Sequence, residues 1–339
     1  MPATIRDVAK KAGVAPSTVS KALNSTGAVS QETLLKVKQA AHVLGYRPNA
    51  RARNFATRAT YQMAFLADFP FDAAFVNPHL FEIMRGVQHT LNKKGYAMVM
   101  KHISSRDALS YVEQAWTQRM VDGFVLHMSV LTKRLSAYIG RESIPHIVIG
   151  KPDFDNRLCW IDTDHCLSGR LAVRYLAELG YREYCFVGGR ADDMTSWRRL
   201  HGVRQELKEM GLNLPRERVL QSQSTLADGA RAMKKLLRMN PRPQAVICAN
   251  NPIAFGLMHA LQARGFHIPE DIALITFDSY PFSMLTDPPM TVVDINMYEI
   301  GQEAGRLVLQ KLRHPATQIQ TYITTPTLVC RGTTPVVAE

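Results

Sequence analysis

The chain has 339 residues, of which 46% are hydrophobic and 21% charged, and its formal net charge is +12. This length and balance predict a soluble globular protein of two or three domains, and the lack of any apolar run of about 18 residues excludes a membrane-spanning helix. Five scattered cysteines without a CxxC pair, and an N-terminus without an apolar leader, predict a reduced cytoplasmic protein that needs no metal or cofactor.

Basic residues are concentrated near the N-terminus. Residues 1–60 hold ten Lys or Arg but only two acidic residues, which gives a local charge of +8. This distribution suits a polyanionic partner such as DNA. A solvated basic face is the alternative, and charge alone does not reject it.

Residues 4–24 (TIRDVAKKAGVAPSTVSKALN) predict two short helices joined by a tight turn. Four apolar residues of the first helix follow the spacing i, i+3, i+4, i+7 and mark its buried face: Ile5, Val8, Ala9 and Ala12. Thr4 is placed to cap this helix and Gly13 to end it, while Pro16 suits the first turn of the second helix.

The second helix is expected to expose small polar and cationic side chains. Val19, Ala22 and Leu23 would face the first helix, which leaves a polar set pointing outward: Ser17, Thr18, Ser20 and Lys21. Such side chains suit base edges and phosphates, and the layout is a helix-turn-helix. A helical pair with a merely solvated polar face remains the alternative at this point.

A third helix and a basic segment follow. Ser30 is placed to cap a helix that ends at Gly45, and Asn49 can cap a short helix within residues 49–58. That short segment carries three arginines and a small apolar side that includes Phe55: Arg51, Arg53 and Arg58. So short a helix is marginal in water, so a flexible linker that becomes helical on DNA is equally consistent.

From Tyr61 onward, short apolar runs alternate with amphipathic helices. Strands are expected near the following segments: 63–69, 97–102, 123–127, 146–149, 184–189, 245–250 and 272–278. Alternation of this kind predicts doubly wound parallel sheets. Two runs, 62–160 and 161–290, predict two similar α/β lobes that share a last helix and strand.

Several polar residues stand directly after predicted strands, where open α/β sheets bind ligands. They are Asp68, His127, Asn250, Asn251 and Asp278. Each alone suits a loop cap, but their common location favours a ligand site between the lobes. No HExxH, GxSxG or P-loop pattern is present, so no enzyme activity is expected.

The sequence resembles the lactose/galactose repressor family of bacterial transcription regulators. The segments TIRDVAKKAGV, STVSKALN, LGYRPNARAR, RLHGVRQEL, VICANNPIAFGLMHAL and IPEDIALITFD carry the resemblance over nearly the whole chain. It implies an all-α helix-turn-helix headpiece (1–46), a hinge helix (47–60), and a two-lobed, periplasmic-binding-protein-like core (61–339). It also implies a homodimer, a near-palindromic double-stranded DNA operator, and a small effector, usually a sugar.

The resemblance also implies particular DNA-binding roles. Pro16, Ser17 and Lys21 match base-reading positions, while Thr18 and Ser20 match phosphate contacts. Phe55 stands where the family inserts a leucine into the minor groove, a role that an aromatic ring can also fill. Four further residues complete the expected DNA-binding set: Thr4, Asn24, Asn49 and Arg51. Ala15 replaces the usual capping serine, which removes a side-chain oxygen.

For the effector, the resemblance implies Arg199, Asp278 and Asn250 as ligating residues. The expected effector set is completed by five others: Asp68, Phe71, His127, Asp162 and Trp197. Gly150 and Lys151 replace an aspartate that some members carry, and Ser224 replaces a stacking aromatic, for which Trp197 or Phe71 could serve. No particular sugar follows from these residues.

The implied mechanism is a repressor whose lobes close on an effector and so pair or separate two hinge helices. Release of DNA by the effector is favoured over corepression. Two alternatives lack DNA binding: a solute-binding protein and a sugar-processing enzyme. The basic headpiece opposes the first, and the absence of an activated nucleophile opposes the second.

Overall fold

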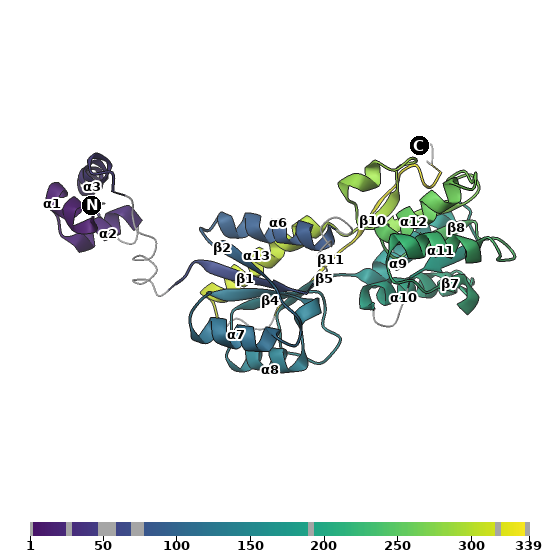
Figure 1. Ribbon diagram of the computed structural model, residues 1–339, viewed down its shortest axis with the longest axis horizontal. Helices are drawn as coiled ribbons and strands as arrows, with labels where there is room; N and C mark the ends of the chain where they lie inside the picture. Colours follow the sequence, from purple (N-terminus) through teal and green to yellow (C-terminus); the bar gives the residue numbers. More distant parts are fainter. Residues whose placement is uncertain are drawn as a thin grey trace. The chain divides into compact units, whose positions relative to one another are not determined.

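The computed structural model describes residues 3–24, 29–46, 59–68, 78–188, 193–315 and 320–335. The chain forms two compact units, Met1–Tyr61 and Gln62–Glu339 (Figure 1). The predicted hinge helix lies outside the described residues. The same holds for four predicted site residues: Asn49, Arg51, Phe55 and Phe71.

The first unit contains three described helices: α1 (Ile5–Ala12), α2 (Pro16–Asn24) and α3 (Gln31–Val43). Their small core consists of seven buried apolar residues: Val8, Ala9, Val19, Ala22, Val37, Ala40 and Ala41. Thr4 begins α1 with a reciprocal cap, because its Oγ1 accepts from the Asp7 amide at 3.4 Å and its own amide donates to the Asp7 carboxylate at 2.8 Å. The three predicted helices are therefore confirmed.

The second unit has two lobes, each built on a six-stranded sheet. The first sheet is all parallel, in the order β11 (Thr321–Thr324), β5 (Trp160–Thr163), β4 (His146–Ile149), β3 (Gly123–His127), β1 (Gln62–Ala67), β2 (Ala97–His102). The second has the order β12 (Thr327–Val329), β10 (Thr291–Asp294), β9 (Ala273–Phe277), β8 (Ala245–Cys248), β6 (Tyr184–Val187), β7 (Val219–Leu220). Only β12 in that sheet is antiparallel, to β10.

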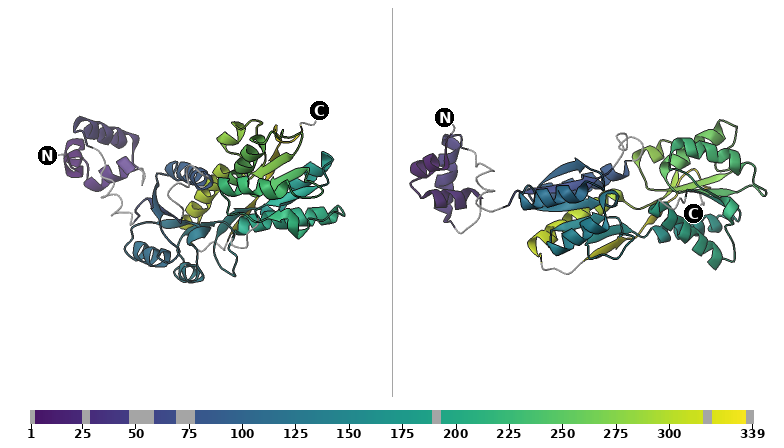
Figure 2. Two further views of the ribbon diagram at one scale, coloured as in Figure 1. Left: turned by 45° about the vertical axis from the view of Figure 1, so that its right-hand side comes forward. Right: turned by 60° about the horizontal axis from the view of Figure 1, so that its bottom comes forward.

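Helices cover both faces of each sheet (Figure 2). The first lobe carries α6 (His79–Asn92) and α13 (Met297–Arg313) on one face, and α7 (Ala108–Thr117) and α8 (Lys133–Arg141) on the other. The second lobe carries α9 (His165–Glu178), α10 (Met194–Glu209), α11 (Leu226–Leu236) and α12 (Asn251–Gln262). Three short 3₁₀ turns complete the core: η1 (Met128–Val130), η2 (Arg216–Arg218) and η3 (Pro281–Met284). The predicted doubly wound α/β architecture is confirmed.

The chain passes between the lobes three times: from β5 to α9, from β10 to α13, and from β11 to β12. The predicted division at residue 160 is therefore wrong in detail, because β5 belongs to the first sheet. The last helix is not shared, since α13 packs on α6 and on strands of the first lobe. The single predicted last strand is two strands, β11 and β12, one in each sheet.

Helices α9 and α10 cross at a pair of glycines. A Cβ on Gly169 would lie 2.1 Å from the carbonyl oxygen of Arg199, and one on Gly202 would lie 1.9 Å from that of Cys166. No side chain larger than hydrogen fits there unless the helices separate. Paired glycines occur in the same way where α6 meets α13 (Gly86 and Gly301). This close crossing fixes the position of α10, which carries Arg198 and Arg199.

Candidate functional site

Helix α2 presents the predicted DNA-binding side chains to solvent. Pro16, Ser17 and Lys21 are exposed, while Thr18 and Ser20 are half-buried beside the core residue Val19. Thr4, another predicted residue, is exposed at the start of α1. Asn24 is the last residue of α2, and its side chain lies outside the described part of the structure. The described members thus lie on or beside one small helical surface.

The start of α2 depends on backbone hydrogen bonds. The Ala15 carbonyl accepts from the amides of Thr18 and Val19 at 2.9 and 3.1 Å. As the sequence predicted, an alanine at this position offers no side-chain oxygen for the remaining free amides. Pro16, which has no amide hydrogen, reduces the number of donors left unsatisfied.

The core contains a cavity of about 400 Å³ between the lobes, here called the interlobe cavity. Its polar lining comes from strand ends and helix starts: His127, Lys151 and Asp162 from the first lobe, and His165 and Arg198 from the second. Of the predicted effector residues, His127 and Asp162 line it. The other described members do not: Asp68, Trp197, Arg199, Asn250 and Asp278.

Asp162 is the most extensively bonded carboxylate of the interlobe cavity. Its Oδ1 accepts from the Thr163 amide at 2.8 Å and lies 3.2 Å from His165 Nε2. Its Oδ2 accepts from the Lys151 amide at 2.8 Å and from Arg198 Nη1 at 3.1 Å. Burial acts to raise the pKa of Asp162, but these hydrogen bonds outweigh it and hold the pKa below its usual value.

Arg198 joins the two lobes. It stands on α10 of the second lobe, and its guanidinium donates to Asp162 on β5 and, at 3.1 Å, to the carbonyl of Lys151 after β4. Both acceptors belong to the first lobe. An ion pair and a hydrogen bond therefore hold one relative orientation of the lobes beside the cavity.

His127 is held at the end of β3 by the turn that follows. Its Nδ1 accepts from the Ser129 amide at 3.2 Å and lies 2.9 Å from Ser129 Oγ, which accepts from the Asp68 amide at 2.9 Å. Burial lowers the pKa of His127 to about 4, so the ring is neutral at pH 7. Asp68 therefore supports His127 through its backbone, and its side chain is exposed.

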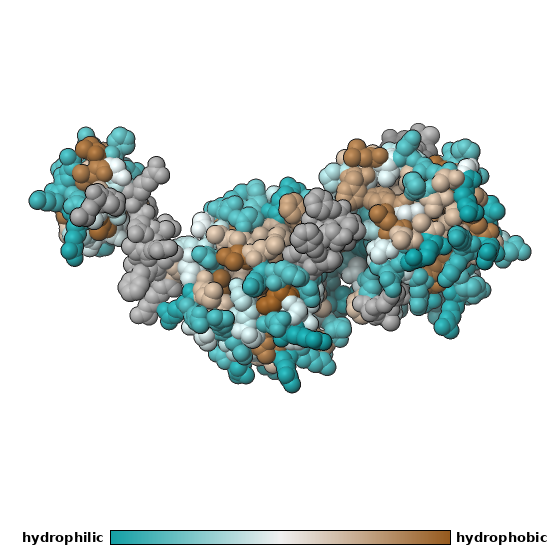
Figure 3. All heavy atoms as spheres, viewed as in Figure 1, coloured by the Kyte–Doolittle hydropathy of each residue, from teal (hydrophilic) through white to brown (hydrophobic). Residues whose placement is uncertain are grey.

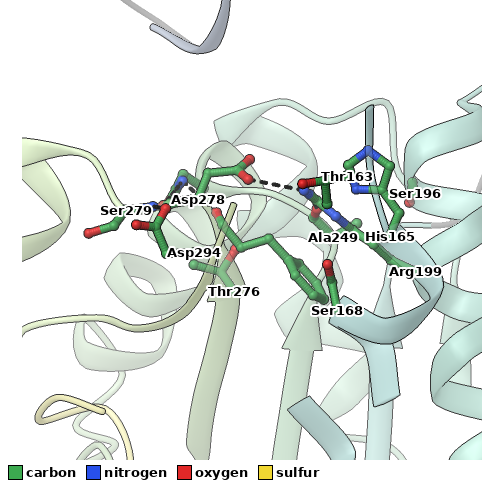
Figure 4. A network of polar contacts seen from close by, with 12 residues as sticks. Thr163, His165, Ser168, Ser196, Arg199, Ala249, Thr276, Asp278, Ser279 and Asp294 are labelled. Carbon is green, nitrogen blue, oxygen red and sulfur yellow. Dashed lines mark hydrogen bonds and ion pairs between the residues drawn. The ribbon is translucent and has the colours of Figure 1, made fainter. Parts of the chain in front are cut away.

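Arg199 and Asp278 form a buried ion pair in the second lobe (Figure 4). The guanidinium donates to Asp278 Oδ1 at 3.0 Å and to the Ala249 carbonyl at 2.7 Å, and it lies 4.3 Å from the centroid of the Phe277 ring. Only 2% of Arg199 and 5% of Asp278 is exposed. The two side chains thus face each other, whereas the sequence predicted that both would face a ligand.

The two asparagines after β8 have structural partners. Asn250 caps α12, because its Oδ1 accepts from the Ile253 amide at 3.2 Å. Asn251 donates to the carbonyls of Phe277 and Asp278 at 2.8 and 2.9 Å, and so supports Asp278 in a left-handed conformation with φ of 71°. Trp197, another predicted effector residue, is 45% exposed and stacks on His201, and it is not part of the cavity lining.

Models of known protein families match segments of both units. The model of bacterial regulatory proteins of the lacI family matches residues 4–49, and that of the periplasmic binding protein-like domain matches residues 173–334. The ribose operon repressor of Escherichia coli (strain K12) is 30% identical over 333 residues, which cover 97% of this chain and 99% of that protein. The chain belongs to the LacI family of bacterial regulatory proteins.

Other relatives and structures agree with this assignment. The HTH-type transcriptional repressor PurR of Aliivibrio salmonicida (strain LFI1238) is 28% identical over 97% of this chain and 98% of that protein. A transcriptional regulator CelR–cellobiose complex has a TM-score of 0.73 at 27% identity, with coverage of 98% and 99%. The lac repressor dimer bound to operator and the anti-inducer ONPF shares the fold, with a TM-score of 0.81 at 23% identity and coverage of 99% and 100%.

These findings make the protein a LacI-family transcriptional regulator with a helix-turn-helix headpiece and a periplasmic-binding-protein-like core. The named relatives are transcriptional repressors and not enzymes. None of the helices in the described ranges has the length and apolar character needed to cross a membrane.

Several polar residues of this LacI-family cavity were missing from the predicted effector set, among them His79, Lys151, His165 and Arg198. Lys151 follows a strand and was noted only as a departure from the family. His79 and His165 are the first residues of α6 and α9, both line the cavity, and burial lowers the pKa of His79. Helix starts face the ligand edge as strand ends do, and that signal could have identified both histidines.

A larger cavity, of about 600 Å³, lies elsewhere on the first lobe. It is lined by α8 and by His146 at the amino end of β4, whereas effectors of open α/β sheets bind at carboxyl ends. His146 Nδ1 donates to the Ile144 carbonyl at 2.7 Å, and Nε2 accepts from the Cys159 amide at 3.0 Å. Both ring nitrogens are therefore used within the fold.

Proposed function

We propose that the protein is a repressor that binds a near-palindromic operator as a homodimer and releases it when an effector binds in the interlobe cavity. One observation carries this proposal. A solvent-facing α2 with base-reading residue types belongs to the same chain as a core with a polar cavity between two lobes. The cytoplasm is the compartment that such a function requires.

On DNA, Pro16, Ser17 and Lys21 would read base edges in the major groove, while Thr18 and Ser20 contact phosphates. Their exposure supports these roles, and the exposed cations of α1 add a nonspecific attraction to the backbone: Arg6, Lys10 and Lys11. Asn49, Arg51 and Phe55 are proposed to act in the hinge, with Phe55 as a minor-groove wedge.

Exposed apolar side chains support association with a second copy. The large ones include Phe81 on α6, Met100 on the edge strand β2, and Met284 and Leu285 around η3. Leu285 is 83% exposed, and Figure 3 shows apolar side chains gathered on the second lobe. Exposed patches of this kind mark interfaces. The lac repressor structure named above is a dimer on operator.

The effector is proposed to be a small metabolite, a saccharide or a derivative of one. A ribose operon repressor and a CelR–cellobiose complex are among the similar proteins. In the interlobe cavity the effector would contact groups of both lobes and so favour one lobe orientation. It can shift operator affinity only by its different affinity for the two orientations.

A DNA-binding measurement with a matched control tests the proposal. An operator is selected from random duplexes with the full-length protein, and its affinity is measured by fluorescence anisotropy at several salt concentrations. Lys21→Ala should weaken operator binding about fivefold or more, because a lost base or phosphate contact costs about 1–3 kcal/mol. Lys36→Ala, which removes an exposed α3 lysine paired with Glu32, is the control. If no duplex is enriched at low salt, the proposal fails.

A further inference from the structure

The carboxylates that line the interlobe cavity are already occupied by protein groups. Asp162 has four partners, two on each oxygen, which fill the positions that a carboxylate offers. Asp193 caps α10 by accepting from the Ser196 amide at 2.9 Å, and its second oxygen accepts from Ser224 Oγ at 3.3 Å. Asp162 is therefore not available as the main acceptor for the hydroxyl groups of a neutral sugar, whereas each oxygen of Asp193 has one recorded bond.

The cavity instead offers a cation. Lys151 is exposed, and within the described ranges its ammonium makes no ion pair; its nearest recorded partner is the Trp160 ring, with Nζ 5.9 Å from the centroid. Its backbone is fixed, because the amide donates to Asp162 and the carbonyl accepts from Arg198. A long cationic side chain thus projects from a rigid point on the cavity lining.

His127 offers a hydrogen-bond donor beside the same cavity. Its Nδ1 is an acceptor, since a backbone amide, that of Ser129, points at it. The proton of the neutral ring therefore resides on Nε2, for which no hydrogen bond is recorded among the described residues. An acceptor atom in the cavity can receive this N–H.

His165 adds a buried nitrogen without a partner. The residue is 5% exposed and lines the cavity, and its Nε2 lies against Asp162. Its Nδ1 is one of two buried side-chain polar atoms in the described ranges with no hydrogen bond, and the other is Arg199 Nε. Buried polar atoms without partners are rare in native proteins, and a bound ligand or water commonly accounts for them.

Most of the remaining lining is apolar and lacks an aromatic stacking surface, although His79, Ser129 and Thr195 also belong to it. It includes Ile83, Ile149, Ile161 and Ile300, and no Trp, Tyr or Phe among the described residues. Aliphatic side chains bury the carbon skeleton of a ligand but give no aromatic face to a sugar ring. The polar groups of the cavity therefore decide which ligand binds.

We propose that the effector carries an anionic group, a carboxylate or a phosphate, that lies against Lys151 Nζ and His127 Nε2. This inference rests on the proposed function, which places the effector in the interlobe cavity. Charge-assisted hydrogen bonds from an ammonium and an imidazole N–H suit an oxyanion, and they are stronger than bonds to a neutral hydroxyl. Asp162 already has four partners, and the Lys151 ammonium is a cation without an ion pair in the described part of the chain.

Matched neutral and anionic probes test the inference on the full-length protein. Isothermal titration calorimetry compares ribose with ribose 5-phosphate, and glucose with glucose 6-phosphate and gluconate. The phosphate and carboxylate arms separate the two anion types. At least one anionic probe should bind ten times more tightly than its neutral partner, and added salt should weaken it. If no anionic probe exceeds its neutral counterpart, the inference is overturned.

Two lysine variants locate the site. Lys151→Met should weaken the preferred anionic probe at least tenfold and leave the affinity of the neutral partner unchanged, while Lys151→Arg should retain most of the anion preference. Lys234→Met, at an α11 lysine that is not part of the cavity lining, is the control. Thermal unfolding of each variant checks that it is folded. Equal anion affinity in Lys151→Met and wild type would overturn the inference.

Operator binding separates this inference from the proposed function. A wild-type protein that binds anionic probes through Lys151 but selects no operator would contradict the proposed function and uphold the inference. A protein that selects an operator and releases it with a neutral sugar would uphold the proposed function and contradict the inference.

Discussion

The two lobes of the core share one winding pattern, but polar residues that follow their strands differ in the partners they have. In the second lobe, Arg199, Asp278 and Asn251 are buried and bonded to one another or to backbone carbonyls. In the first lobe, Lys151 offers a cation and His127 an N–H donor, and neither has a recorded acceptor among the described residues. Position at a strand end therefore does not by itself make a polar residue a ligand group. The hydrogen bonds that the residue already makes determine whether it has capacity left for a ligand.

The difference has a physical cause. A buried charge without a partner is unstable, so Arg199 and Asp278 each need the other. Lys151 is exposed and keeps its water, so it needs no partner until a ligand replaces that water. Arg199 and Asp278 thus pair within the second lobe, whereas the Lys151 ammonium has no ion pair in the described part of the chain.

The largest expected effect is on stability, from breaking the buried pair. Arg199→Met leaves the Asp278 carboxylate buried without its cation, which should lower the free energy of unfolding by about 3–5 kcal/mol. Asp278→Asn, which tolerates the left-handed backbone, should also destabilise by leaving Arg199 unpaired. Urea denaturation of the full-length protein measures both. A loss under about 1 kcal/mol in Arg199→Met would show that the pair is not structural.

The second largest expected effect on stability comes from the close contact of α9 and α10 at Gly169 and Gly202. Gly202→Ala places a Cβ within 1.9 Å of the Cys166 carbonyl oxygen, so α9 and α10 must separate, at about 1–3 kcal/mol. Gly140→Ala, in helix α8, is the control, because a Cβ at this position would have no packing neighbour within 4 Å among the described residues. Alanine should increase the free energy of unfolding there by about 0.5–1 kcal/mol. Denaturation curves that rank the two variants in the opposite order would refute this packing account.

Acid sensitivity of the first lobe is a third, smaller effect. Burial lowers the pKa of His146 to about 4, below its value in the unfolded chain. The unfolded state therefore binds the proton first, so stability is full above about pH 6.5 and falls as the pH drops toward 4. Between pH 7 and 5 this histidine should cost about 1–2 kcal/mol.

His146→Gln tests that assignment, because an amide can also donate to Ile144 and accept from Cys159 without titrating. The variant should lose less stability than wild type between pH 7 and 5 in urea denaturation. Equal losses in the two proteins would assign the acid sensitivity to other groups, of which the buried His127 is the first to examine.

The smallest stability effect is expected at Lys151, the open counterpart of Arg199. Lys151→Met removes an exposed ammonium without an ion pair and should change the free energy of unfolding by less than about 0.5 kcal/mol. A loss comparable to that of Arg199→Met would mean that the two lobes do not differ in the way described.

Much of the fold was predictable because its signals are local. Thr4, Gly13 and Pro16 mark helix ends within a few residues, and the apolar strands β1, β3 and β9 are buried runs between turns. Strands β11 and β12 were not resolved as two. Each is short and partly exposed, with Ile323 of β11 at 55%, and each is defined by pairing with a distant strand.

The site was less predictable because its roles depend on distant partners. Position after a strand placed Asn250 and Asp278 near a ligand edge, and the family resemblance added Arg199. Neither predicted the bonds that Arg199 makes to Ala249 and Asp278. The bridge from Arg198 to Asp162 spans the two lobes and has no local pattern. Whether a polar side chain has all its hydrogen-bond partners depends on residues distant in the sequence. That property distinguishes polar groups used within the fold from those still available to a ligand.

The central claim is that a ligand in the interlobe cavity controls operator affinity. Fluorescence anisotropy with the selected operator tests it most directly, in wild type and in Lys151→Met, with and without the tightest anionic probe at saturation for wild type. The probe should weaken operator binding at least tenfold in wild type, and far less in Lys151→Met at the same concentration. By linkage, operator should weaken probe binding by the same factor. A probe that binds wild type in the cavity and leaves operator affinity unchanged would contradict the claim.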